Sequence, residues 1–399
     1  MNIIFLCRLF HQFRGGLESY TYEMARALAA RGHAVHIICE DKGDFYRHTL
    51  EDGIHVHAIA YNENPFPGSW KINSIIPLHD ILYSRKAAEK IHALIKTTGI
   101  DIVEAPDVQE QGFWYAWNKR TPFFLRLHGW FFMRKFSTLE KPRQRLSLRK
   151  AILKKMQRNS ILKADGVATV SSDFAGFIRE FWNLKNNPID VIHNAVDTSL
   201  FHAADGQREL SVLFVGRMEH KKGIRVLARA IPAVLREFPN VKFYFAGRNT
   251  RLDSGSETAY EYILKYAPKD SVVFLGELAT QALIPYYQKI AIGVFPSLYE
   301  PFGIVALESM ACGCATIASR VGGLMDIIDH ERDGLLVQPG DHEELSIAII
   351  RFFKEESLRK NCSINAIKKV KEQFTMDKLV DHTLAAYQRA VETFHHSFV

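Results

Sequence analysis

Residues 211–247 read SVLFVGRMEHKKGIRVLARAIPAVLREFPNVKFYFAG. An apolar run ends at Gly216, a helical pattern follows over 223–238, and a second apolar run ends at Gly247. This order is typical of a strand–helix–strand unit, in which the two strands pair in parallel. The stretch therefore predicts an α/β fold built on a parallel sheet wrapped by helices.

The same alternation continues on both sides of this unit. Downstream, the apolar runs VVFLG and IGVFPS alternate with helical patterns near 257–267 and at 280–289. Upstream, a comparable series begins with NIIFLC at residues 2–7 and ends with PIDVIHNAV. Two consecutive series of similar size predict two doubly wound, Rossmann-like domains that face each other across an interdomain cleft.

A polar stretch at 199–208 separates the two series and is expected to act as a hinge. We therefore assign residues 1–200 to a first domain and residues 201–375 to a second domain. The helical pattern that follows, within 376–399, fits either domain by pattern alone and can pack back on the first.

Composition excludes several classes of protein. The 399 residues are 47% hydrophobic and 24% charged, which excludes intrinsic disorder. The five cysteines form no CxxC pair, which argues against a zinc ribbon or a disulfide framework and for a reducing compartment. No apolar run approaches the ~20 residues of a membrane span, and the N-terminal stretch lacks the pattern of a signal peptide. We expect a cytoplasmic protein.

The positive charge is concentrated in one segment. The net charge is +7, and residues 134–163 alone contain 11 Lys and Arg against a single acid, Glu140. Within this segment Leu148, Ile152 and Met156 recur every four residues, which predicts an amphipathic basic helix with these side chains toward the core. A row formed by Lys150, Lys154 and Arg158 is expected on the opposite face.

Two interpretations of the basic helix remain open. A solvated charged face over a core-facing stripe is one. Reversible binding to anionic lipid head groups is the other, with Trp130 and the basic row on the membrane or acceptor side. Binding of nucleic acid is not expected, because the segment lacks interleaved aromatic residues.

Strand-to-helix turns supply the first candidate site residues. Gly15 and Gly16 precede the first helical pattern, where backbone N–H groups can bind a phosphate, although a tight turn explains the pair equally well. Arg217 and Lys222 stand between a strand and a helix, so both cations can reach one anion such as a pyrophosphate. Two solvated cations are the alternative.

The sequence EPFGIVALE, residues 300–308, supports the anion-binding interpretation. If a helix begins near Phe302, Glu300 lies before its N-terminus and Glu308 about two turns along it. The N–H groups of Gly303 and Ile304 would then be free to bind an anion or sugar hydroxyls. A surface helix with an acid at each end is the alternative.

These motifs together resemble the retaining glycosyltransferases of family 4, which have the two-domain GT-B fold. The resemblance is strong from about 190 to 345 and looser before that. It is carried by HGW at 128–130, VIHNAVDTSLF at 191–201, LFVGRMEHKKG, FPSLYEPFGIVALESMACGCATIAS and VGGLMDIIDHERDGLLVQPGD. Its most specific element is the pair of glutamates separated by seven residues, beside Arg217 and Lys222.

The resemblance implies a nucleotide-sugar donor held mainly by the second domain, with the first domain on the acceptor side. Arg217 and Lys222 would clamp the pyrophosphate, Glu308 would bind the ribose, and Glu300 would bind the donor sugar. His128 matches the cleft histidine of the family, although a core histidine is the alternative. The implied catalytic residues are Glu300, His128, Arg217 and Lys222. The implied donor-binding residues are Gly15, Gly16, Gly216, Arg217, Lys222, Gly247, Phe274, Glu300, Phe302, Gly303, Ile304 and Glu308.

The implied activity is transfer of a hexose-like sugar, with retention, to an acceptor hydroxyl in cell-surface polysaccharide or glycolipid assembly. The donor is expected to be a UDP-sugar, with GDP- and ADP-sugars still open. The chain has no DxD motif, so we expect no divalent metal and no cofactor. A nonhydrolysing sugar-nucleotide epimerase, a phosphorylase and a nucleotide-sugar-binding protein without turnover are the rival functions.

Overall fold

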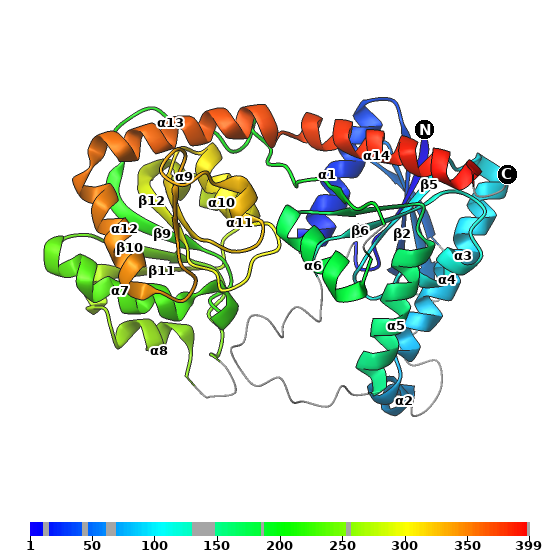
Figure 1. Ribbon diagram of the computed structural model, residues 1–399, viewed down its shortest axis with the longest axis horizontal. Helices are drawn as coiled ribbons and strands as arrows, with labels where there is room; N and C mark the ends of the chain where they lie inside the picture. Colours follow the sequence, from blue (N-terminus) through cyan, green and yellow to red (C-terminus); the bar gives the residue numbers. More distant parts are fainter. Residues whose placement is uncertain are drawn as a thin grey trace.

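A computed structural model of the chain describes residues 1–10, 16–41, 47–60, 69–129, 148–184, 187–252 and 257–396. Two α/β units stand side by side in it, and long helices run along one edge of both (Figure 1). The prediction of two Rossmann-like domains built on parallel sheets is confirmed. In the described part of the chain, no helix is both long enough and apolar enough to cross a membrane.

The described residues of the first unit form an eight-stranded sheet in the order β3-β4-β2-β1-β5-β6-β7-β8. Its central strands are almost fully buried because helices cover both faces (Figure 1). The strands are β1 (Asn2–Leu6), β2 (Ala34–Asp41), β3 (Arg47–Glu51), β4 (Ile54–Ala60), β5 (Ile102–Pro106), β6 (Phe123–Leu127), β7 (Gly166–Thr169) and β8 (Asp190–Val191). The helices are α1 (Gly16–Ala30), α2 (Ser69–Ile75), α3 (Leu78–Thr98), α4 (Phe113–Trp117), α5 (Leu148–Lys163) and α6 (Ser172–Trp182).

The second unit has a six-stranded parallel sheet in the order β11-β10-β9-β12-β13-β14. The order reverses between β9 and β12, and ligands of doubly wound sheets bind at such a switch point. The strands are β9 (Glu209–Val215), β10 (Phe243–Ala246), β11 (Val272–Gly276), β12 (Ile290–Phe295), β13 (Ala315–Ser319) and β14 (Leu335–Val337). The helices are η2 (His220–Lys222), α7 (Ile224–Glu237), α8 (Ala259–Leu264), η3 (Lys269–Ser271), α9 (Thr280–Lys289), α10 (Ile304–Ala311), α11 (Leu324–Ile327), α12 (His342–Lys354) and α13 (Glu356–Gln373).

The last helix, α14 (Met376–His396), leaves the second unit and packs on the first (Figure 1). Its Val380, Ala386 and Tyr387 are buried in the same hydrophobic cluster as strands β1 and β2. The chain thus crosses between the units twice, and the two crossing segments pair with each other. The backbone N–H of Val196 donates a hydrogen bond to the carbonyl oxygen of Phe374 at 2.9 Å.

A buried polar cluster fastens α14 to the first sheet. Arg126 on β6 is fully buried, and its Nε lies 3.1 Å from Glu104 Oε1 on β5. From α14, the Tyr387 hydroxyl donates to Glu104 Oε2 at 2.6 Å, and the Thr383 hydroxyl accepts from Arg126 Nη2 at 2.9 Å. The Tyr20 hydroxyl of α1 donates to Glu104 Oε1 at 3.2 Å. Each side of the buried ion pair therefore has further hydrogen bonds, as a buried charge requires.

Helix α5 has its predicted orientation only in part. Its buried side chains are Leu153, Met156, Gln157, Ser160 and Ile161, whereas Leu148 is 58% exposed. Lys154 does not belong to a free basic row, because its Nζ lies 4.3 Å from the centre of the Phe181 ring. The predicted stripe and row are therefore right in part: Met156 is buried and Lys150 and Arg158 are exposed, but Leu148 faces outward. The polar Gln157 and Ser160, which also face the core, do not appear in a hydrophobic pattern.

Four histidines stack at the outer edge of the first sheet. His36 on β2, His48 on β3, and His55 and His57 on β4 form ring pairs with centroids 4.7–5.4 Å apart. His36 Nδ1 lies 3.0 Å from His57 Nε2. Burial, with the neighbouring His55, His48 and Lys90, lowers the pKa of His36 from 6.5 to about 4. Burial, Lys90 and the other three rings lower the pKa of His57 to about 3.

This cluster predicts a loss of stability in mild acid. Because the pKa values of His36 and His57 are lower in the folded state, the unfolded chain takes up more protons below pH 6.5, and stability falls as the pH drops toward 4. Between pH 7 and pH 5 each of the two histidines contributes about 2 kcal/mol to this pH dependence, so we expect His36→Gln/His57→Gln to remove about 4 kcal/mol of it. Urea unfolding at both pH values measures it, with the exposed His382→Gln as control. Equal pH dependence in all three proteins would contradict the expectation.

Candidate functional site

The candidate site lies at the switch point of the second sheet, after β9 and β12. Gly216 and Arg217 follow β9, and Ser297 and Glu300 follow β12. The loop after β6 of the first sheet also meets this region, because a Cβ atom on Gly129 would lie 2.9 Å from Pro301 Cγ. The structure therefore brings the loops of both units together where the sequence motifs were found.

Lys222 and Glu300 form the ion pair at the centre of the site. Lys222 Nζ lies 2.5 Å from Glu300 Oε2, and the Ser297 hydroxyl donates to the same oxygen at 3.3 Å. Glu300 is buried and the Lys222 side chain is 20% exposed. The pair joins η2 to the loop after β12, across 78 residues of sequence. Ser297 was not anticipated as a partner of Glu300.

Glycines allow the backbones around this pair to approach closely. At Gly223, with φ of 71°, a Cβ would lie 1.7 Å from the Pro296 carbonyl oxygen. At Gly322, with φ of 50°, it would lie 1.9 Å from the Glu300 carbonyl oxygen, and the N–H of Gly323 donates to that oxygen at 3.0 Å. Only glycine fits at both positions, so the two turns fix the backbone of Glu300 and the end of η2.

Arg217 is not joined to the central pair. Its side chain is 60% exposed, and its Nη2 lies 3.3 Å from Glu219 Oε1, which also pairs with Lys221 at 3.3 Å. Behind Arg217, a Cβ on Gly247 would lie 2.0 Å from the Gly216 carbonyl oxygen. The loops after β9 and β10 are therefore in contact, and the exposed Arg217 side chain has room to turn toward an anion.

Glu308 lies in α10, which begins at Ile304 with Gly303 at its N-cap. The helix starts two residues later than expected, so Glu308 lies little more than one turn along it. The Tyr287 hydroxyl donates to Glu308 Oε2 at 3.0 Å. Burial raises the pKa of Glu308 to about 7, although this hydrogen bond acts in the opposite direction. The carboxyl group can therefore donate or accept a hydrogen bond near neutral pH.

His128 occupies the first-domain side of the site. Its backbone N–H donates to Asp107 Oδ1 at 3.0 Å, and its ring meets the Tyr20 ring edge-on at 4.5 Å between centroids. Among the described residues, Nε2 has no hydrogen-bond partner. Burial and the nearby Arg126 charge lower the pKa of His128 to about 3. The imidazole is therefore neutral at physiological pH and can exchange a hydrogen bond with a hydroxyl group.

The remaining predicted residues have separate positions. Phe274 on β11 stacks on Tyr260 at 3.8 Å between centroids, and Phe302 is buried beside the His193 ring at 5.9 Å. Gly16 opens α1, with open space around its Cβ position. Gly15 and Trp130 lie outside the described residues.

Asp326 connects the two units. It accepts hydrogen bonds from the Ser172 backbone N–H at 2.7 Å and from His193 Nε2 at 2.9 Å. Burial acts to raise the pKa of Asp326, but these hydrogen bonds outweigh it and lower the pKa below its usual value. The contact places the α11 segment against the N-terminus of α6 and holds the units together at the site.

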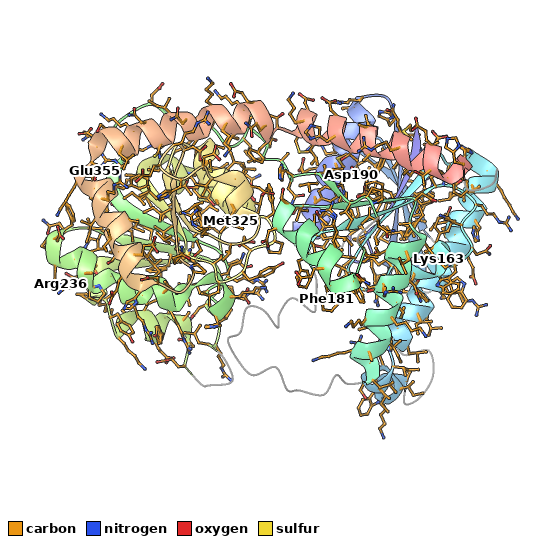
Figure 2. The ribbon with its side chains drawn as sticks, viewed as in Figure 1. Lys163, Phe181, Asp190, Arg236, Met325 and Glu355 are labelled. Atoms are coloured by element: carbon orange, nitrogen blue, oxygen red, sulfur yellow. The ribbon has the colours of Figure 1, made fainter. Side chains whose placement is uncertain are left out.

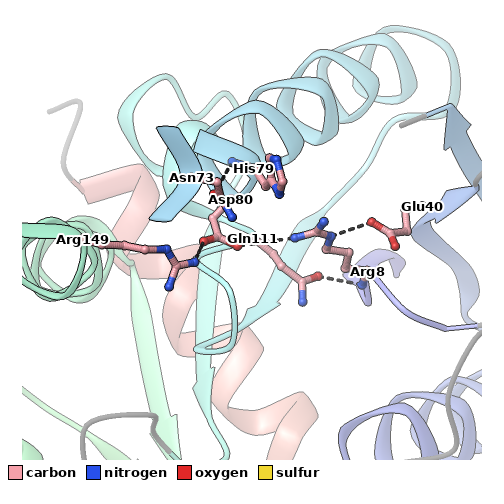
Figure 3. Close-up of polar contacts among 7 residues, drawn as sticks. All are labelled: Arg8, Glu40, Asn73, His79, Asp80, Gln111 and Arg149. Atoms are coloured by element: carbon pink, nitrogen blue, oxygen red, sulfur yellow. Dashed lines mark hydrogen bonds and ion pairs between the residues drawn. The ribbon is translucent and has the colours of Figure 1, made fainter. Parts of the chain in front are cut away.

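A buried polar cluster closes the carboxyl end of β1 in the first unit (Figure 3). Arg8 Nε lies 2.6 Å from Glu40 Oε2, and Arg8 Nη1 lies 3.4 Å from Asp80 Oδ1. Arg149 of α5 completes the cluster, with Nη2 at 2.9 Å from Asp80 Oδ2. The Arg8 backbone N–H donates to Gln111 Oε1 at 2.8 Å. These contacts fix α3 and α5 against the edge of the first sheet that faces the site.

Comparison with known families gives matches over most of the chain. Residues 14–200 match the family model described as Glycosyltransferase Family 4, and residues 201–369 match the model described as Glycosyl transferases group 1. The boundary between the two matches falls between residues 200 and 201.

Known proteins of similar sequence include two from microorganisms. An uncharacterized glycosyltransferase of Methanocaldococcus jannaschii is 33% identical over 251 residues, which are 59% of this chain. The match spans only 63% of that relative's length. A glycogen synthase of Mycobacterium tuberculosis is 26% identical over 84% of this chain and 81% of its own.

Solved structures share the fold. Sucrose-phosphate synthase from Thermosynechococcus elongatus superposes with a TM-score of 0.77 at 22% identity, over 97% of this chain and 98% of its own. An Anabaena protein, HepE, solved in complex with UDP and glucose, superposes with a TM-score of 0.68 at 18% identity, over 97% of this chain and 99% of its own. At these identities the likeness establishes the two-domain architecture alone.

Proposed function

The chain belongs to the family 4, group 1 glycosyltransferases, and from this we propose that it transfers a hexose-like sugar from a nucleoside-diphosphate sugar to an acceptor hydroxyl, with retention. The observation that carries the proposal is the Lys222–Glu300 pair at the switch point of the second sheet. Such a site offers a cation for a diphosphate and a carboxylate for sugar hydroxyls within one hydrogen-bond length of each other.

The proposed reaction needs no separate catalytic base. The acceptor hydroxyl attacks the anomeric carbon on the face that the phosphate leaves, the bond from this carbon to the phosphate oxygen breaks, and that oxygen takes the acceptor's proton. Lys222 and a reoriented Arg217 stabilise the charge on the departing diphosphate. Neutral His128 holds a sugar hydroxyl from the first-domain side.

Double displacement through Glu300 is the competing mechanism. We favour direct transfer because Lys222 and Ser297 both bind Glu300 Oε2, which lowers the nucleophilicity of that oxygen. The cations also supply the charge that a divalent metal would bring, so we propose a metal-independent reaction.

We propose a UDP-sugar as the donor, in polysaccharide or glycolipid assembly. In support, the similar Anabaena structure was solved with UDP. The catalytic domain of starch synthase IV from Arabidopsis thaliana, which also has the fold, was solved with ADP and acarbose. ADP-sugars are therefore included among the donors to be screened. GDP-sugars belong in the same test.

A screen of UDP-, ADP- and GDP-sugars by thermal shift and donor hydrolysis tests the function. One donor is expected to raise the melting temperature and to be consumed slowly. At a hundredfold excess over its Kd, binding adds about 2.7 kcal/mol to the free energy of unfolding. The released sugar is expected to keep the donor's anomeric configuration, as read by proton NMR before mutarotation. Binding without consumption would favour the nonenzymatic alternative, and inversion at C2 of the donor would indicate an epimerase.

Glu300→Gln and Glu308→Gln are expected to have different kinetic effects. Glu300, bound to Lys222, acts on the reacting sugar, so its replacement lowers kcat. Glu308, held by Tyr287 away from that pair, acts on the ribose, so its replacement raises the KM for the donor. Steady-state kinetics with varied donor measures both constants. An equal rise in KM with unchanged kcat in both variants would refute this division of roles.

A further inference from the structure

Exposed apolar side chains gather on three neighbouring helices of the first unit. Helix α5 contacts both α2 and α4, and α2 lies beside the lower end of α5 in Figure 1. The exposed apolar residues on these helices include two tryptophans at 57% and 63% exposure. We call this surface the α2–α4–α5 face, and its apolar members are Trp70, Ile72, Ile75, Trp114, Trp117, Leu148 and Leu162.

The same face is positively charged. No Asp or Glu occurs in the sequences of α2, α4 or α5. Lys155 and Arg158 are exposed on α5, on the stripe between Leu148 and Leu162. Arg149 does not contribute, because it turns inward to Asp80 (Figure 3).

Tryptophan rings and lysines lie together on this face. Lys163 Nζ lies 4.3 Å from the centre of the Trp117 ring, and Lys71 Nζ lies 5.4 Å from the centre of the Trp70 ring. Figure 2 shows Lys163 at the end of α5 nearest α4. Each pair combines an exposed tryptophan ring with a cation, and such side chains suit the boundary between lipid head groups and acyl chains.

The core of the protein does not need these side chains. Helix α5 packs inward through Leu153, Met156 and Ile161, which are at most 8% exposed. Leu148, Lys155, Arg158 and Leu162 lie on its opposite side. An exposed apolar patch of this kind marks a site of interaction rather than a packing defect.

We propose that the α2–α4–α5 face binds an anionic lipid surface. Protein interfaces are depleted in lysine at their centres, whereas this face interleaves lysine with tryptophan. Electrostatic attraction brings the face to the membrane, each cation near the surface strengthening binding about fivefold, and the tryptophans enter the interface. The surface therefore includes α2 and α4, which the sequence did not indicate. If the proposed function is right, the first unit delivers a membrane-bound acceptor to the loop of His128.

Sedimentation with lipid vesicles tests the electrostatic part without donor or acceptor. The full chain is expected to pellet with vesicles of phosphatidylglycerol and phosphatidylcholine at low salt, to be released at high salt, and to stay in solution with phosphatidylcholine alone. Lys155→Glu/Arg158→Glu is expected to weaken binding more than about tenfold. Lys368→Glu/Lys371→Glu, on exposed positions of α13, changes the net charge equally and is expected to bind as the wild type does. Equal loss in both variants, or no pelleting at low salt, would overturn the proposal.

Quenching by lipids brominated in the acyl chain tests insertion. Wild-type tryptophan fluorescence is expected to fall in brominated vesicles, and Trp70→Phe/Trp114→Phe/Trp117→Phe is expected to lose most of this quenching while still pelleting. Undiminished quenching in the triple variant would show that another part of the chain meets the membrane. Concentration-dependent dimerisation that the triple variant abolishes would assign the face to a second copy of the chain, and would also overturn the proposal. Neither measurement depends on the transferase activity.

Discussion

Replacing Lys222 by alanine is expected to lower kcat about 100- to 1000-fold, equivalent to about 2.7–4 kcal/mol of transition-state stabilisation. Lys222 is the cation at the switch point, and its Nζ lies 2.5 Å from Glu300. Its removal withdraws the charge that meets the departing diphosphate and leaves a buried carboxylate without its cation. The measurement is transfer or donor hydrolysis at saturating donor, with circular dichroism to show that the fold is retained.

Lys221 provides a matched control one residue away. It pairs with Glu219, and Lys221→Ala is expected to keep kcat within about twofold. Arg217→Ala is expected to give a loss between the two, since Arg217 must first leave Glu219. A double-mutant cycle with Lys222→Ala and Glu300→Gln is expected to be strongly non-additive. If Lys221→Ala and Lys222→Ala were equally active, the site would be wrongly placed.

Arg126→Met is expected to cost about 3–5 kcal/mol of unfolding free energy. The change leaves Glu104 buried with hydroxyl donors but without a cation, and it removes the bond to Thr383 of α14. Urea denaturation followed by circular dichroism measures the loss. The matched surface variant Arg85→Met breaks an exposed pair with Glu89 and is expected to cost less than about 0.5 kcal/mol.

The double variant Arg126→Met/Glu104→Gln keeps this test informative if the single variant does not accumulate. It removes both charges together, so it is expected to recover part of the lost stability. If the single and double variants were equally unstable, packing of the Arg126 side chain, rather than the uncompensated charge of Glu104, would account for the loss.

Regular alternation made most of the fold predictable. The helix expected at 280–289 is α9, and the helix expected over 223–238 is α7, within one residue at each end. The antiparallel strand β3 was missed because its sequence, RHTLE, carries no apolar run and depends on pairing with β4. Strands that depend on one neighbour leave a weak local signal.

Helix α5 shows a different limit. Its period was recognised and Met156 is buried as predicted, but Leu148 faces outward and the polar Gln157 and Ser160 face the core, so the hydrophobic pattern gave only part of the buried side. Tertiary packing decides such cases, and no local rule detects them.

The site was predictable where a motif was present. Lys222 and Glu300 could be recognised because each lies in a turn between a strand and the helix that follows it in the sequence. Their supporting partners could not, because contacts such as Ser172 with Asp326 join residues 154 positions apart. A hydrogen bond between distant loops leaves no spacing to recognise in a single sequence.

Because α14 returns to the first unit, that unit is built from two stretches of the chain that are separated by the whole second unit. Leu379, Val380 and Tyr387 fill its core, so a chain that stopped at 375 would leave this core open to water although every strand of both sheets would be present. A chimera that borrows the second unit from a relative must therefore exchange an internal cassette, joined on both sides at the paired segments near Val196 and Thr375. Recombination at a single junction would combine a first sheet with a final helix shaped for another protein.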